Sequence, residues 1–348
     1  MSAQIEPLSP GAANPLGPSR LSAFGSAFVA NGFTMYPVLL LLVIIGAFIA
    51  PRFLTVLNLV NILEQVSVLG LTTIGLTFVV LIGRLDLSLE GIVGFAPMLA
   101  AILLVPVATG GLGTELPGWM GPVIAVGAAG LIGVFNGFMV VKVGINPFIS
   151  TLGLLVLLQG GILIISKGRS IYSPGEALTW LGSTRIAGLP VSVMVFALVA
   201  TAVGLLFKYH RYGRALYAVG GNEDAARAAG INVDRIIWSA FIFAALLAGL
   251  AGVLMTGRLD SAVTSQGEGI IFSAFAAAVI GGVSLGGGKG TIVGVVSGVL
   301  LIGVINNLLT LAQVPSFFVK ASTGAVIIIA AILTTVASNR SSGVKTRT

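Results

Sequence analysis

Residues 236–257 read IIWSAFIFAALLAGLAGVLMTG, a stretch that contains no charged side chain. A helix needs about 20 mostly apolar residues to cross the hydrocarbon core of a bilayer. The stretch therefore predicts a transmembrane helix. It also decides the fold class, because windows of the same kind recur along the whole chain.

These windows predict an all-α, polytopic integral membrane protein with about ten transmembrane helices. The segment FLTVLNLVNILE at 53–64 is predicted either as an interfacial helix or as an extension of the second span. The predicted spans lie near residues 33–50, 65–83, 88–108, 119–141, 147–166, 188–207, 236–257, 269–286, 291–311 and 317–337.

The composition supports this class. Of 348 residues, 56% are hydrophobic and 8% are charged, too few charges to cover a surface that faces water. The chain has no cysteine and one histidine, His210, so we expect no disulfide, no thiolate nucleophile and no metal site. The excess of 18 Lys and Arg over 11 Asp and Glu is typical of loops kept on the cytoplasmic side. We therefore expect lipid around the chain and no nucleic acid partner.

The basic residues also predict the orientation. With the N-terminus inside, twelve of the eighteen Lys and Arg residues fall in cytoplasmic segments, which favours a cytoplasmic N-terminus and C-terminus. Residues 1–32 are rich in Pro, Gly and Ser and are expected to form a disordered cytoplasmic tail before an uncleaved first span. Residues 33–337 then form the membrane domain, and 338–348 form a second cytoplasmic tail.

A polar stretch, GGNEDAARAAGINVDR at 220–235, interrupts the apolar pattern within a predicted cytoplasmic segment at 208–235. Asn222 is suited to cap a short helix, and Glu223 and Asp224 lie at its positive end. Gly230 supplies a left-handed stop. Because an isolated helix this short is marginal in water, its stability must come from packing against something else.

Two glycine-rich turns resemble each other, IGRLDLSLEGIVG at 82–94 and IGGVSLGGGKGTIVG at 280–294. They indicate either an internal repeat of two halves, as in many transporters, or a chance likeness of turns.

The turn at 280–294 contains GGGKGT, which resembles part of a phosphate-binding loop. However, Val283 stands where such a loop needs Gly, and Gly290 stands where it needs Ser or Thr. We expect no ATP site in this chain, so energy for transport would come from a partner or from a coupled ion.

Asp86 and Glu90 lie four residues apart where a loop enters the third span. They could form a proton relay, or they could be helix-start carboxylates near Arg84.

Neutral polar residues in or near the spans could hydrogen-bond a polyhydroxylated solute, or could only join helices to one another. These residues are Asn58, Asn61, Gln65, Asn136, Asn146, Gln159, Asn306 and Asn307.

The outer loop at 167–187 carries Arg169 and Arg185 beside aromatic residues, and it either docks a protein or marks the membrane interface.

Five motifs in this order resemble the permease subunits of bacterial ATP-binding-cassette importers for simple sugars, the ribose, xylose, arabinose and galactose group. They are LIGRLDLSLEGIVG, GINPFISTLG, GRALYAVGGNEDAARAAGI, VIGGVSLGGGKGTIVG and GVINNLLTL. The resemblance covers residues 33–337. It implies a non-enzymatic transport subunit that forms a dimer in the bacterial inner membrane, binds two cytoplasmic ATPase subunits and receives solute from a soluble binding protein. It further implies that ATP and Mg are bound by the ATPase and that this chain holds no cofactor.

The resemblance assigns the polar stretch to a coupling segment that docks on the ATPase. The predicted coupling residues are Gly220, Gly221, Asn222, Glu223, Ala225, Ala226, Arg227, Ala229 and Gly230, with Ala225, Ala226 and Ala229 as an alanine face. The predicted passage residues are Asn61, Gln65, Asp86, Ser88, Asn136, Asn146, Thr151, Asn306 and Asn307. Arg169 and Arg185 are predicted to dock the binding protein.

The chain departs from the family at Arg84, where Gly83-Arg84-Leu85-Asp86-Leu87-Ser88 replaces the usual Gly-Gly-Ile-Asp-Leu-Ser. This departure leaves open which polar solute is carried. Two other functions also stay open at this point: a proton-coupled secondary transporter that uses Asp86 and Glu90, and a membrane scaffold. The capped helix at 222–229 and the lack of an ATP site favour the importer permease.

Overall fold

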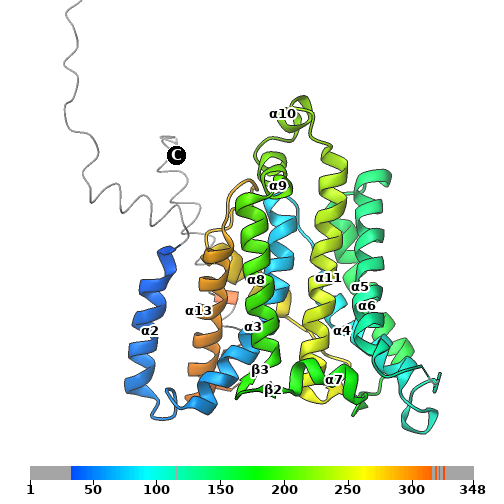
Figure 1. Cartoon of the computed structure of the whole chain (residues 1–348), viewed down its shortest axis with the longest axis vertical. Helices are drawn as coiled ribbons and strands as arrows, with labels where there is room; N and C mark the ends of the chain where they lie inside the picture. The colour runs from blue at the N-terminus through cyan, green and yellow to red at the C-terminus, as the bar shows by residue number, and fades with distance from the viewer. Residues whose placement is uncertain (1–32, 115, 316–317, 320, 322–323, 326–348) are drawn as a thin grey trace, which may run out of the picture.

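The computed structural model describes residues 33–114, 116–315, 318–319, 321 and 324–325, and in them the chain forms one bundle of helices (Figure 1). Among the described residues, six helices are long and apolar enough to cross a membrane. They are α3 (Val56–Leu81), α5 (Met120–Phe138, continued by the π-helical turn η3, Met139–Val143), α6 (Pro147–Ser166), α8 (Val191–Tyr209), α11 (Val233–Leu259) and α13 (Ile292–Leu311). Three shorter apolar helices join them: α2 (Tyr36–Ile49), α4 (Ser88–Leu104) and α12 (Ile270–Ile280).

Each predicted span from 33–50 to 291–311 overlaps one of these apolar helices. The segment at 53–64 belongs mostly to α3, so it extends the second span. The predicted spans at 88–108 and 269–286 continue beyond the ends of their helices, because α4 ends at Leu104 and α12 ends before the Gly281–Gly282 turn. The predicted span at 317–337 lies mostly outside the described residues, and so do the predicted tails at 1–32 and 338–348.

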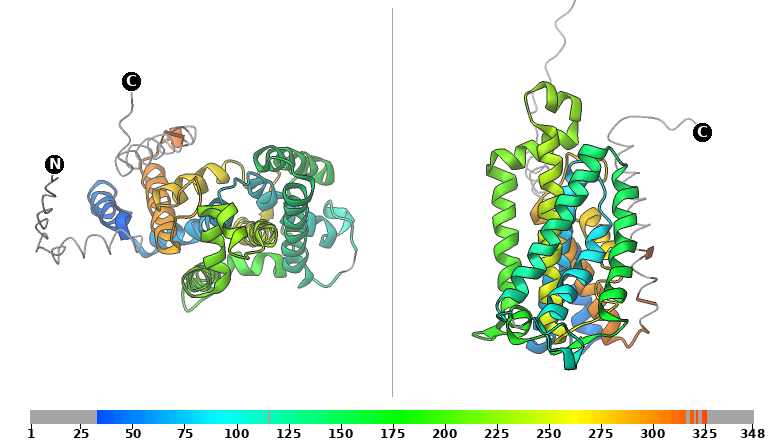
Figure 2. Two further views of the ribbon diagram at one scale, coloured as in Figure 1. Left: turned by 90° about the horizontal axis from the view of Figure 1, so that it is seen from above. Right: turned by 90° about the vertical axis from the view of Figure 1, so that its right-hand side faces the viewer.

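The two ends of the bundle differ (Figures 1 and 2). One end, here called the α10 end, carries α9 (Arg211–Gly221) and α10 (Glu223–Ala228), and α10 projects beyond the long helices. The opposite end, the α7 end, carries α7 (Glu176–Ser183) and the hairpin of β2 (Arg185–Ile186) with β3 (Leu189–Pro190). The remaining elements are η1 (Phe33–Met35), η2 (Val107–Thr109) and the antiparallel pair of β1 (Ile171–Tyr172) with β4 (Ser261–Ala262).

The centre of the bundle is formed by α3 and α11, which pack against each other, while α11 also packs against α4, α5 and α7. Small residues allow this contact. A Cβ added to Gly75 would lie 2.9 Å from the carbonyl oxygen of Ala244, and one added to Gly252 would overlap the carbonyl oxygen of Val93. By contrast, α6 and α8 are mostly exposed, as expected of helices whose outer faces contact lipid.

Buried amides tie distant helices together. Asn58 of α3 and Asn307 of α13 exchange two hydrogen bonds, with Nδ2 to Oδ1 distances of 2.9 and 2.8 Å. Gln266, in the turn before α12, donates through Nε2 to the carbonyl oxygens of Val93 and Gly252 at 3.1 and 3.0 Å. This single side chain therefore holds α4 and α11 to the turn that leads into α12.

Replacing Gln266 with Leu should lower the free energy of unfolding by about 1–3 kcal/mol, because it removes the donor that satisfies buried oxygens. The measurement is thermal unfolding of the detergent-solubilised protein. Thr310→Val is the matched control, since the exposed Thr310 hydroxyl bonds only the Asn306 carbonyl of its own helix, and it should stay within about 0.5 kcal/mol. Equal melting temperatures for the two variants would contradict the role given to Gln266.

Candidate functional site

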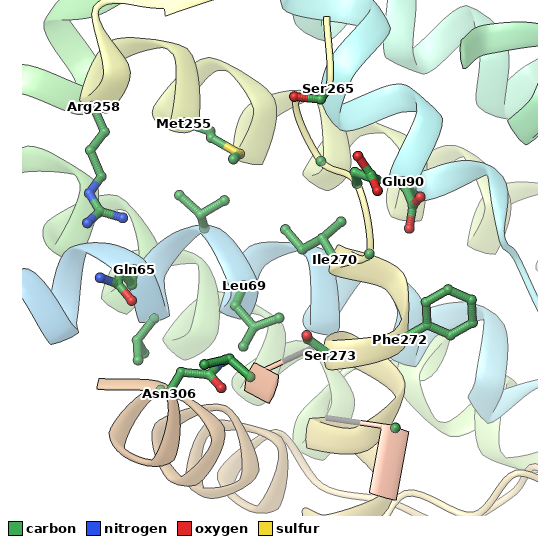
Figure 3. A pocket seen from close by; sticks show the side chains of 18 residues that line it. Gln65, Leu69, Glu90, Met255, Arg258, Ser265, Ile270, Phe272, Ser273 and Asn306 are labelled. Atoms are coloured by element: carbon green, nitrogen blue, oxygen red, sulfur yellow. The ribbon is translucent and has the colours of Figure 1, made fainter. Parts of the chain in front are cut away.

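A cavity of about 820 Å³ opens between α3, α4, α11, α12 and α13. Figure 3 shows Gln65 of α3, Arg258 of α11 and Asn306 of α13 around it, with Ser273 of α12. Its volume lies within the range of small-molecule sites in proteins. The hydrogen-bonding side chains in its lining are Gln65, Glu90, Arg258, Ser265, Glu268, Ser273 and Asn306.

The polar lining offers both donors and acceptors. Glu90 is buried and accepts a hydrogen bond of 3.3 Å from the amide of Gln159 on α6. Glu268 adds a second carboxylate, and Arg258 adds a guanidinium group. Such a lining can hydrogen-bond hydroxyl groups from several sides, and the apolar residues Leu69, Met255, Ile270 and Phe272 complete the wall.

A buried carboxylate orients the arginine of the cavity. The Oε2 atom of Glu64, next to Gln65 on α3, lies 3.6 Å from Nε of Arg258, and its Oε1 atom lies 3.1 Å from Nη2 of Arg185 in β2. The side chain of Glu64 is 10% exposed, whereas that of Arg185 is 46% exposed. Glu64 therefore connects the hairpin at the α7 end to the wall of the cavity.

The cavity brings together only part of the predicted passage set. Gln65 and Asn306 line it. Asn307 instead pairs with Asn58, and Asn146 caps α6 by accepting a 2.9 Å hydrogen bond from the Phe148 amide. Thr151 is buried and bonds the carbonyl of Phe148 in its own helix, and Asn61 is half-buried one turn before Gln65.

Arg258, Ser265, Glu268 and Ser273 were not predicted as passage residues. Ser265 and Glu268 belong to a turn that the sequence pattern counts as ordinary polar loop. Arg258 lies at the end of a predicted span, where basic residues are common. No local signal distinguishes them, because they face the cavity only through the packing of α11 and α12 against α3.

Asp86, Ser88 and Asn136 form a separate buried cluster where the turn after α3 enters α4. The Oδ1 atom of Asp86 accepts hydrogen bonds from the Ser88 amide at 2.9 Å and from the Ser88 hydroxyl at 2.6 Å. Asn136 of α5 donates to the same hydroxyl oxygen at 2.8 Å. Burial raises the pKa of Asp86 from 3.8 to about 6, although both hydrogen bonds from Ser88 oppose the rise. Asp86 thus lies in this buried cluster, whereas Glu90 lines the cavity.

This pKa predicts a pH-dependent contribution to stability. A carboxyl group whose pKa is raised by folding contributes stability that is complete below pH 3.8 and is lost as the pH rises through about 6. Replacing Asp86 with Asn removes the titration. The melting temperature of wild type, relative to Asp86→Asn, should therefore be higher at about pH 5 than at about pH 7.5. An unchanged difference between the two pH values would show that Asp86 does not titrate as proposed.

At the α10 end, the predicted local features of the polar stretch are present. The Asn222 side chain accepts a 2.8 Å hydrogen bond from the Ala225 amide and caps α10, and Gly230 has a φ of 82°. Glu223 lies 3.1 Å from Arg84 and 3.5 Å from Arg227. The extra charge at Arg84 therefore faces α10 and not the cavity.

Only part of the predicted alanine face is exposed. Ala225 and Ala229 are exposed, as is Ala228. Ala226 is only 4% exposed, because it points from α10 toward the bundle. The face that a partner can reach is thus formed by Ala225, Ala228 and Ala229.

The two arginines of the predicted docking pair at the α7 end have different contacts. Both arginines are exposed, but Arg185 also donates a hydrogen bond to the buried Glu64. Among the residues that the structure describes, no three His, Cys, Asp or Glu side chains lie together so as to hold a metal ion.

Comparison with known proteins identifies the family. Residues 58–333 match the family described as branched-chain amino acid transport system / permease component. The chain is 38% identical over 305 residues to the ribose import permease protein RbsC of Bacillus subtilis (strain 168), which covers 85% of this chain and 90% of that protein. It is 36% identical over 300 residues to the D-allose transport system permease protein AlsC of Escherichia coli (strain K12), with 86% and 90% covered.

A third relative is the L-arabinose ABC transporter permease protein AraH of Azospirillum brasilense, 32% identical over 282 residues, with 81% of each chain covered. The family match at 58–333 includes the residues of the cavity, the Asp86 cluster and α10. The chain therefore belongs to this family of transport-system permease components, and it is a membrane transport subunit and not an enzyme.

Proposed function

We propose that this chain forms the membrane passage for a monosaccharide or a similar polar solute in an ATP-driven importer. The observation that carries the proposal is the cavity of about 820 Å³, whose lining combines amide, hydroxyl, carboxylate and guanidinium groups. A sugar presents many hydroxyls that each need a donor or an acceptor when water is removed. The similarity to ribose, allose and arabinose permeases supports the same class of solute.

Each end of the bundle would bind a different partner protein. The α10 end would face the cytoplasm of a bacterial cell and bind an ATPase subunit that holds ATP and Mg. The exposed alanines of α10 and the basic residues of this end support that orientation. A second copy of the chain would complete a homodimer in the inner membrane, and this chain would hold no cofactor.

The α7 end would then face outward and receive a soluble binding protein. Arg169 is the better candidate for contact with that protein, because it is exposed and Arg185, although also exposed, is already paired with Glu64. Arg185 would act indirectly, by holding the hairpin beside the cavity. Rim charges of this kind steer association more than they set affinity.

The test is uptake of labelled pentoses and hexoses by vesicles that contain the chain, the ATPase and the binding protein. Uptake should require ATP, and Ser273→Trp should reduce it at least about ten-fold by filling the cavity. Gly153→Trp on α6 is the matched control, since a Cβ added there would meet no atom within 4 Å, and it should retain uptake. ATP-independent uptake driven by a proton gradient would instead support a proton-coupled carrier.

Because the chain has no cysteine, single cysteines can test the orientation. Arg169→Cys should react with a membrane-impermeant thiol reagent on intact cells, and Arg227→Cys should react only after the membrane is opened. Both positions are exposed, so lack of access would not explain a negative result. Labelling of Arg227→Cys from outside would reverse the proposed orientation.

A further inference from the structure

Three segments that are far apart in the sequence meet at the α10 end through their backbones. They are the turn after α3, the C-terminal end of α9 and the turn between α12 and α13. The Gly288 amide donates a 2.8 Å hydrogen bond to the carbonyl oxygen of Leu81. We call this contact the glycine junction, and its members are Leu81, Gly83, Gly220, Gly287 and Gly288.

The glycine junction leaves no room for a Cβ at Gly220, Gly287 or Gly288. A Cβ added to Gly220 would overlap the carbonyl oxygen of Leu81 and lie 2.6 Å from the nitrogen of Gly288. One added to Gly287 would lie 2.7 Å from the nitrogen of Gly83, and Gly287 also has a φ of 83°. Backbones in such direct contact cannot slide by repacking side chains, so the three segments must move together.

Two side-chain contacts strengthen the link to α9 and α10. The Tyr217 hydroxyl of α9 donates a 2.7 Å hydrogen bond to the carbonyl oxygen of Gly290. The Arg84 guanidinium, in the turn after α3, lies 3.1 Å from the Glu223 carboxylate at the start of α10. Both side chains of this pair are partly exposed, so the pair adds little stability, but it joins the start of α10 to the turn after α3.

Both turns of the junction lead to the cavity. The turn after α3 continues through the Asp86 cluster into α4, which carries Glu90. The other turn connects α12, which carries Ser273, to α13, which carries Asn306. The cavity walls formed by α4, α12 and α13 are therefore connected to turns that meet each other and α9 at the glycine junction.

We propose that the glycine junction, together with the Arg84–Glu223 pair, transmits displacement of α9 and α10 to α4, α12 and α13. The inference rests on the proposed function, in which an ATPase binds the α10 end. A rigid contact converts a small shift at that end into relative motion of the cavity walls, because packed backbones do not deform continuously. Gly220 and Arg84 are thus positioning residues that act on the cavity through the turns.

Gly220→Ala tests the junction. Alanine favours a helix over glycine by about 1 kcal/mol, so within α9 alone the change is favourable and any loss must come from the close contact. We expect solute taken up per ATP hydrolysed to fall at least about ten-fold. Gly286→Ala is the control, because its Cβ would meet only the Ser284 hydroxyl at 3.7 Å, and uptake per ATP should be unchanged.

A double-mutant cycle tests the ion pair without altering the backbone. Arg84→Ala and Glu223→Ala should lower uptake per ATP by similar factors, and the double variant should lose no more than either single variant. Asp234→Ala, which breaks the 3.3 Å contact between Asp234 and Arg227 within the same region, should have no such effect. If Gly220→Ala does not assemble, this cycle decides the question.

Independent, multiplying losses in the cycle, or normal uptake per ATP in Gly220→Ala, would overturn the inference while leaving the proposed function intact. Failure of the wild-type chain to support ATP-driven uptake would instead overturn the proposed function. The two failures are therefore distinguishable in one set of vesicle measurements.

Discussion

The structure depends on close contact between helix backbones at small residues. Lipid tails are as apolar as Leu or Val, so burying apolar side chains between helices releases little free energy in a membrane, and tight packing must hold the bundle together. Gly75 meets α11, Gly252 meets α4, and Gly182 and Gly257 bring α7 against α11. A larger side chain at any of these positions would separate two backbones that the rest of the bundle is built around.

Polar side chains also hold the helices of the bundle together at a few points. The Asn58–Asn307 pair joins α3 to α13, and Gln266 joins α4 and α11 to the turn before α12. Because these groups satisfy one another inside the bundle, they are not available to a solute. The cavity is formed where α3, α4, α12 and α13 separate, and its polar groups belong to a different set of residues, such as Glu90 and Arg258.

The same close packing explains how the α10 end can act on a cavity deeper in the bundle. At Gly220 and Gly288 two turns and a surface helix share one backbone contact, and each turn leads into a cavity wall. At the α7 end the link is made by charge instead, since Glu64 holds both Arg185 of the hairpin and Arg258 of the cavity. The two ends therefore reach the cavity by different physical means, one steric and one electrostatic.

The sequence by itself determined the features that are set locally. Apolar length predicted the spans from 33–50 to 291–311, and short-range rules predicted the Asn222 cap and the Gly230 stop, because each depends on residues a few positions apart. Tertiary structure alone decided that Asn306 faces the cavity while Asn307 does not, that Ala226 packs inward, and that Arg84 meets Glu223. Those outcomes depend on which helix faces meet across long stretches of chain, and neighbouring polar residues carry no local signal of that choice.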